Sequence, residues 1–225
     1  MADAPRTALL LGPTGLTGSH LLRLLAGDPR WARVVSVGRR EVPSAGPSHI
    51  HHIIDFERLA DHADVLHADD VFCALGATIK KARTEEAFRR IDLDYPFLIA
   101  NVAREQGATQ YLLVSALGAD LKSRIWYNRL KAEAEEAIRS VGFPSYSIFR
   151  PSLLFGDREE LRPKEWVMRG ALALARPALL GRLRKYRPTP GAALARVMVE
   201  QAAAHPAGVH IIEAEVILDR ARALA

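Results

Sequence analysis

Short apolar runs alternate along this chain with longer segments in which apolar residues recur at helical spacing. The runs predict strands at 8–11, 33–37, 51–55, 70–75, 110–115 and 145–149. The helical spacing predicts helices at 19–26, 57–63, 84–106 with a break near residues 94–96, and 123–141. Strands that are apolar throughout are typical of a parallel sheet covered on both faces. The pattern therefore predicts an α/β protein with a doubly wound parallel sheet.

Beyond Pro151 this alternation changes. Residues 160–183 have a mostly helical pattern interrupted by two prolines, whereas 192–204 predict a further helix and 209–214 a late strand. In open α/β sheets the ligand lies beyond the carboxyl ends of the strands. We therefore expect a single domain over residues 1–225, in which residues 151–208 form a small region that covers the substrate.

The first predicted strand ends in a glycine-rich turn, Gly12-Pro-Thr-Gly-Leu-Thr-Gly18, and a helix follows at once. Gly12 permits the sharp turn, Gly15 lets a pyrophosphate approach the backbone, and Gly18 lets the helix pack on the strand. The helix start offers free N–H groups and the positive end of its dipole to phosphate. The turn predicts a dinucleotide site that includes Thr14 and Leu16. A glycine-rich turn without a ligand is the alternative.

The end of the second strand bears on which dinucleotide binds. An acidic residue there would accept hydrogen bonds from the ribose of NAD, but this chain has Arg39 and Arg40. Two guanidinium groups can hold a 2′-phosphate, which favours NADP(H) over NAD; two solvated arginines are the alternative. Asp55 could bond to the adenine or cap the next helix. Further expected cofactor contacts are Phe56, Ala74, Leu75 and Gly76.

Three residues in the middle of the chain suggest carbonyl reduction. Ser115 ends the fifth predicted strand, and Tyr127 and Lys131 share one face of the next helix. A fixed ammonium stabilises a phenolate, so this tyrosine could donate a proton near neutral pH, while the serine bonds to the substrate oxygen. Alternatively, Tyr127 is a half-buried packing residue and Lys131 pairs with Glu135.

The order and spacing of these motifs resemble the short-chain dehydrogenase/reductases. The finer resemblance is to their Tat-interacting oxidoreductase-like branch, through the segments 12–18, 37–40, 72–81, 90–96, 114–120 and 150–156. It implies a Rossmann fold that binds NADPH, with Ser115, Tyr127 and Lys131 in the reductase roles. It also implies that the nicotinamide lies along Arg150, Pro151, Leu153 and Leu154. Asp92 stands where many members of the superfamily have an asparagine that builds a proton relay.

Composition adds a few expectations. The net charge is 31 − 26 = +5, which an anionic cofactor explains as well as nucleic acid does, so no nucleic-acid partner is expected. Neighbouring histidines such as His51 and His52 point to opposite faces of a strand, so no metal site is expected. The single cysteine, Cys73, suits the core. Without a signal peptide or a run of about 18 apolar residues, we expect a cytoplasmic protein.

Two functions follow from these observations. The first is an NADPH-dependent oxidoreductase that reduces a small carbonyl substrate; the alternative is an NADPH-binding sensor or regulatory scaffold with little or no turnover. The substrate and the oligomeric state stay open. The basic run 182–187 predicts a solvated helix end, with an anionic substrate group or a peripheral membrane contact as alternatives. A reductase requires a pocket bounded by Ser115, Tyr127 and the C-terminal third.

Overall fold

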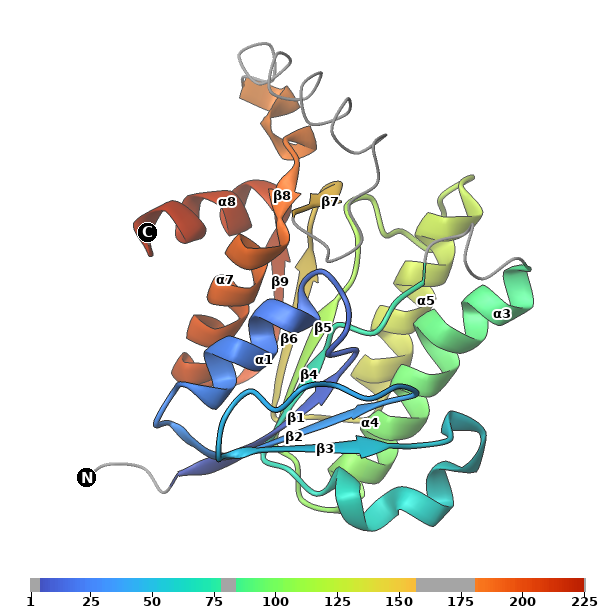
Figure 1. The fold of residues 1–225 in the computed structure, drawn as a ribbon. Coiled ribbons are helices and arrows are strands. Elements are labelled where there is room, and N and C mark those ends of the chain that lie inside the picture. Colours follow the sequence, from blue (N-terminus) through green and yellow to red (C-terminus); the bar gives the residue numbers. More distant parts are fainter. Residues whose placement is uncertain (1–4, 78–83, 157–180, 225) are drawn as a thin grey trace.

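Seven parallel strands form one central sheet in the computed structural model, which describes residues 5–77, 84–156 and 181–224 (Figure 1). The strand order is β3-β2-β1-β4-β5-β6-β9, and every neighbouring pair is parallel. The strands are β1 (Arg6–Leu11), β2 (Trp31–Gly38), β3 (His49–Ile53), β4 (Asp70–Cys73), β5 (Gln110–Val114), β6 (Ser145–Arg150) and β9 (Gly208–Glu213). This Rossmann architecture confirms the predicted fold class.

Helices cover both faces of the sheet, and the chain changes direction between β1 and β4. Figure 1 shows α1, α7 and α8 on one face and α4 and α5 on the other. The helices are α1 (Gly18–Ala26), α3 (Glu85–Arg89), α4 (Tyr95–Glu105), α5 (Trp126–Ser140), α7 (Gly191–Ala204) and α8 (Ala214–Ala223). Ligands of doubly wound sheets bind where the strand order reverses, so the carboxyl ends of β1 and β4 are where a ligand is expected.

Alternate residues of each strand supply the two hydrophobic cores. Ala8 and Leu10 of β1 pack with α1, α7 and α8, whereas Leu9 and Leu11 pack with α4 and α5. All four side chains are fully buried. Both faces of such a strand are buried, which explains the nearly continuous apolar runs in the sequence.

The expected helix over residues 84–106 consists of three parts. A π-helical turn, Arg90–Asp94, separates α3 from α4, and Pro96 lies in the first turn of α4. Proline fits there because the first N–H groups of a helix need no internal partner. The turn matters for the site because it carries the buried residues Asp92 and Leu93.

Other boundaries differ from the prediction in ways that local bonds explain. The helix expected from residue 123 begins at Trp126, because Ser123 accepts a bond from the Ile125 amide and Asp120 one from the Lys122 amide. The helix expected at 57–63 is a 3₁₀-helical segment, Phe56–Leu66, and α8 was not expected. A helical pattern was also predicted at 160–183, of which residues 160–180 lie outside the described residues.

The C-terminal third contacts the glycine-rich turn. Strand β7 (Leu154–Phe155) pairs with β8 (Thr189–Pro190), which leads into α7. A Cβ on Gly191 would lie 2.8 Å from Cγ of Leu16, so the start of α7 lies directly against the turn. None of the helices in the described ranges has the length and apolar character needed to cross a bilayer.

Candidate active site

The glycine-rich turn folds tightly upon itself and against the end of β4. Gly12 has a φ of +78°, and a Cβ there would lie 2.7 Å from the Ala74 carbonyl oxygen. A Cβ on Gly18 would lie 1.9 Å from the Gly12 oxygen, and the Gly15 amide donates to that same oxygen at 3.0 Å. The close contacts require glycine at 12 and 18 and place residues 74 and 75 beside the turn.

The start of α1 has free polar groups. Thr17 occupies the N-cap position without making a capping bond, and the first turn has no acidic residue. The Thr17 hydroxyl is buried and has no partner among the described residues. Buried polar groups rarely stay unpaired, and a helix start without a cap attracts anions. These features fit the pyrophosphate of a dinucleotide.

The two predicted phosphate ligands follow β2 and are exposed. Arg40 lies over the glycine-rich turn, where its guanidinium donates to the Thr14 hydroxyl at 3.4 Å. Within the ranges that the structure describes, neither Arg39 nor Arg40 pairs with a carboxylate. Their charge is therefore available to an anion at this side of the turn.

Asp55 and Phe56 lie at the start of the 3₁₀-helical segment. Asp55 accepts a bond from the Glu57 amide at 3.0 Å, so it caps this segment, which was one of its two expected roles. Phe56 is buried, and its ring lies 5.1 Å from that of Tyr95. An adenine contact by either residue stays a prediction.

Lys131 is held by Asp92. Its ammonium lies 2.7 Å from Oδ1 of Asp92, with 8% and 2% of the two side chains exposed. The other oxygen, Oδ2, accepts a bond from the Ala77 amide at 2.8 Å. Burial alone would lower the pKa of Lys131, but Asp92 and the phenol of Tyr127 outweigh it and raise that pKa above its usual value. The alternative pairing of Lys131 with Glu135 is therefore wrong.

Tyr127 stands one helical turn before Lys131, near the start of α5. It is half-buried, and its ring packs edge-on against Phe88 with the centroids 5.8 Å apart. Gly76 lies nearby, because a Cβ there would lie 3.4 Å from Asp92. The structure thus gathers the tyrosine, the lysine and the loop after β4. Packing and catalysis are compatible at this position.

Ser115 follows β5 and is tied to a buried carboxylate. Its hydroxyl donates to Oε1 of Glu135 at 2.5 Å. Arg150 donates hydrogen bonds to the same carboxylate from Nε at 3.0 Å and from Nη2 at 2.6 Å. Its Nη1 donates to Glu213 at 3.1 Å. The bond to Glu135, together with Glu213, raises the pKa of Arg150 above its usual value despite burial. Serine, glutamate and arginine therefore form one connected group at the carboxyl ends of β5 and β6.

The pairing of Glu135 with Ser115 was not predicted from the sequence. The residue lies among the buried positions of α5 beside Leu130, Ala134 and Ile138. A carboxylate on the apolar stripe of a helix requires a partner, because burying it alone is costly. That position on the stripe was the available indication.

The segment after Arg150 carries the residues that are predicted to contact the nicotinamide. Pro151 is buried, and its carbonyl oxygen accepts a bond from the Leu117 amide at 2.8 Å. Leu153 is 52% exposed, while Leu154 is half-buried in β7. The expected contacts of these residues with the cofactor stay a prediction. Of the C-terminal third, which was expected to bound the pocket, residues 157–180 lie outside the described residues.

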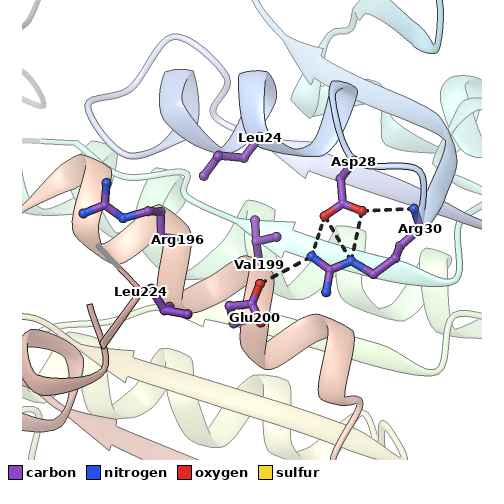
Figure 2. A pocket seen from close by; sticks show the side chains of 7 residues that line it. All are labelled: Leu24, Asp28, Arg30, Arg196, Val199, Glu200 and Leu224. Carbon is purple, nitrogen blue, oxygen red and sulfur yellow. Dashed lines mark hydrogen bonds and ion pairs between the residues drawn. The ribbon is translucent and has the colours of Figure 1, made fainter. Parts of the chain in front are cut away.

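A hollow of about 200 Å³ lies away from these residues, between α1, α7 and the end of α8 (Figure 2). Its lining residues are Leu24, Asp28, Arg30, Arg196, Val199, Glu200 and Leu224. Asp28 and Glu200 both bond to Arg30, so most of its charges are already paired. Because it lies at the opposite end of α1 from the glycine-rich turn, this hollow is not the predicted substrate pocket.

Comparison with known proteins identifies the family, although no family model matches the chain. The rat protein HTATIP2 (Rattus norvegicus) is 34% identical over 168 residues, which cover 73% of this chain and 69% of the relative. "Protein fmp52, mitochondrial" of Emericella nidulans is 34% identical over 180 residues, covering 76% and 77%. The chain belongs to the Tat-interacting oxidoreductase-like branch of the short-chain dehydrogenase/reductases. This superfamily consists of NAD(P)-dependent, oxidoreductase-type Rossmann proteins.

Solved structures support the fold of this family member. MoeE5 in complex with UDP-glucuronic acid and NAD has a TM-score of 0.71 at 18% identity, covering 97% of this chain and 82% of its own. A short-chain dehydrogenase family protein from Francisella tularensis has a TM-score of 0.64 at 11% identity, covering 96% and 100%. At such identities the likeness shows the fold alone.

The comparisons correct the expected location. Several fungal relatives of this family are named mitochondrial, including those of Emericella nidulans and Aspergillus niger. The prediction of a cytoplasmic protein is therefore contradicted. It rested on the lack of a signal peptide and of a long apolar run, and neither feature distinguishes the cytoplasm from the inside of an organelle.

Proposed function

We propose that this protein is an NADPH-dependent oxidoreductase that reduces a small carbonyl compound at Ser115, Tyr127 and Lys131. The observation that carries the proposal is the fixed, buried ammonium of Lys131, a residue that lies one helical turn after Tyr127 on α5. Asp92 keeps this ammonium charged, because it raises the pKa of Lys131. A positive charge held beside a phenol favours the phenolate that remains after proton donation.

Each of the three side chains has a distinct task in this proposal. When bound, NADPH supplies a hydride to the carbonyl carbon. Tyr127 donates its hydroxyl proton to the carbonyl oxygen, and Lys131 stabilises the phenolate that remains. Ser115 donates a hydrogen bond to the same oxygen, for which its hydroxyl hydrogen must turn away from Glu135.

The preference for NADPH over NADH rests on Arg39 and Arg40. Both follow β2 on the side of the glycine-rich turn, and Arg40 already contacts Thr14. A 2′-phosphate at this place would receive charge-assisted hydrogen bonds that the hydroxyl of NADH cannot accept equally well. The uncapped start of α1 and the Thr17 hydroxyl would serve the pyrophosphate of either cofactor.

Tyr127→Phe tests the assignment of the proton donor. With phenanthrenequinone as the carbonyl probe, we expect NADPH consumption to fall by about 100-fold or more, because general acid catalysis contributes at least that factor. NADPH binding, measured by calorimetry, stays within about two-fold, since only a hydroxyl is removed.

Tyr111→Phe is the matched control. Its hydroxyl donates to the Pro96 carbonyl inside the core, so its loss leaves turnover close to the native rate. Native-like turnover by Tyr127→Phe would contradict the assignment. A native protein that binds NADPH but reduces none of a panel of aldehydes, ketones and quinones would favour the sensor.

A further inference from the structure

Asp92 occupies an unusual place in the site. It lies on the π-helical turn Arg90–Asp94, and single π turns in proteins are frequent at functional sites. One carboxylate oxygen contacts the Lys131 ammonium and the other accepts the Ala77 amide. The carboxylate therefore joins the turn, α5 and the loop after β4.

The charge of Asp92 acts on the same group as the charge of Lys131. An opposite charge a few Å away shifts a titration by about 1–3 pH units, and a like charge shifts it the other way. Lys131 alone would make the Tyr127 phenol a stronger acid. Asp92 lies 2.7 Å from that ammonium, so the two form a pair without net charge, whose field weakens faster with distance than that of a lone ammonium.

Among the residues that the structure describes, few other charged groups act on Lys131. The groups that act most strongly on Lys131 are Asp92 on the π-helical turn, Tyr127 on α5 and Cys73 on β4. Burial raises the pKa of the Cys73 thiol, so it carries no charge near neutral pH. The Tyr127 ring itself packs with Phe88, in a cluster whose buried members are all apolar.

We propose that Asp92 sets the acid strength of Tyr127: it cancels much of the Lys131 charge, so the phenol keeps its proton to higher pH than lysine alone would allow. The inference rests on the proposed reductase function, in which Tyr127 is the proton donor. Asp92 is then a positioning and charge-balancing residue. It holds Lys131 in place and protonated, and it limits how far the lysine acidifies the tyrosine.

A titration of four proteins and their four Tyr127→Phe counterparts tests this. Phenolate absorbance is followed with pH in the native protein, Asp92→Asn, Lys131→Met and the double variant, each minus its Tyr127→Phe counterpart to remove the other tyrosines. We expect the Tyr127 midpoint to fall by about one pH unit in Asp92→Asn and to rise by a similar amount in Lys131→Met. In the double variant, which lacks both charges, it returns to within about 0.3 unit of native.

Asp94→Asn is the matched control. Asp94 lies on the same π-helical turn, but 41% of its side chain is exposed and it faces Arg89 at 3.8 Å, so its loss leaves the midpoint unchanged. Circular dichroism checks that each variant folds. Should Asp92→Asn not fold, the double variant still compares a charged pair with an uncharged one.

The result that overturns the inference is a midpoint in Asp92→Asn equal to native, with the double variant equal to Lys131→Met. A double variant more than one unit from native also overturns it. These titrations need neither cofactor nor substrate. If the protein is an active reductase but the Tyr127 midpoint does not shift in Asp92→Asn, only the role of Asp92 is rejected. If the midpoint shifts but Tyr127→Phe still turns over substrate, only the proposed reductase site is rejected.

Discussion

The two halves of the sheet present different chemistry at the same edge. At the β1–β2 half, the glycine-rich turn offers backbone amides, two exposed arginines and a Thr17 hydroxyl that has no partner in the described part of the chain. At the β4–β6 half, Lys131 is paired with Asp92, and Ser115 is tied to Glu135 and Arg150. One half is open to a ligand, whereas in the other the polar groups already satisfy one another.

The first half is suited to binding a ligand, whereas the second half is suited to holding side chains in fixed positions. A site made of backbone and exposed cations can accept an anion without losing any internal bond. A site made of buried charge pairs is rigid, and each member depends on its partner because an unpaired buried charge is costly. We therefore expect substitutions in the second half to reduce stability, and substitutions in the first half to change affinity and leave the fold intact.

Arg150→Ala should give the largest effect. It leaves Glu135 buried with only Ser115 as a side-chain partner, and breaking a buried pair costs about 3–5 kcal/mol of unfolding free energy. Urea denaturation measures the loss. The control is Arg139→Ala, whose partner Glu136 and own side chain are both well exposed, with a change within about 0.5 kcal/mol. A loss for Arg150→Ala no larger than for the control would remove the contrast between the halves.

Ser115→Ala should separate the two roles of this serine. Losing one hydrogen bond costs about 1 kcal/mol of stability, whereas losing a donor to the substrate oxygen slows turnover by about 100-fold. Urea denaturation and the quinone assay measure the two effects. Ser147→Ala removes another buried serine, which accepts a bond from Gln201, and should leave turnover unchanged. Turnover unaffected by Ser115→Ala would make this serine a structural residue only.

Replacing Arg39 and Arg40 together by Ala should have the smallest effect, confined to affinity. NADPH binding should weaken by about 10-fold or more, the value of one charge-assisted hydrogen bond, while NADH binding changes little. Calorimetry with both cofactors measures this. Arg33→Ala, near the other end of β2 and also exposed, is the control. Equal affinity of the native protein for NADPH and NADH would contradict the proposed preference.

The sequence predicts the architecture well because each strand, helix and turn depends mainly on residues that are close together in the chain. Alternation of apolar runs and helical spacing requires a covered parallel sheet, and the glycines at 12, 15 and 18 require a close turn. Boundaries were predicted less well. The helix expected from residue 123 starts later because Ser123 and Asp120 offer the backbone alternative bonds.

Pairing in the site was harder to predict from sequence. Helical spacing offers Glu135 as a partner for Lys131, one turn away. In the structure the lysine pairs with Asp92, and the glutamate pairs with Arg150 at the end of β6. Which buried acid meets which base depends on how separate elements approach one another, and spacing within one helix does not contain that information. The basic run shows the same limit, because its Arg184 pairs with Asp219 on α8.

The buried thiol of Cys73 can be used to measure how often this part of the sheet opens. The only thiol of the chain is fully buried at the end of β4, close enough to Lys131 and Asp92 to interact with both electrostatically. A thiol reagent reaches it only when this part of the sheet opens, so the labelling rate reports how often the β4–β6 half opens in the folded protein. Any ligand that binds only the closed form must slow the labelling in proportion to its occupancy. The chain thus carries a reporter of its own opening that requires no substrate and no mutation.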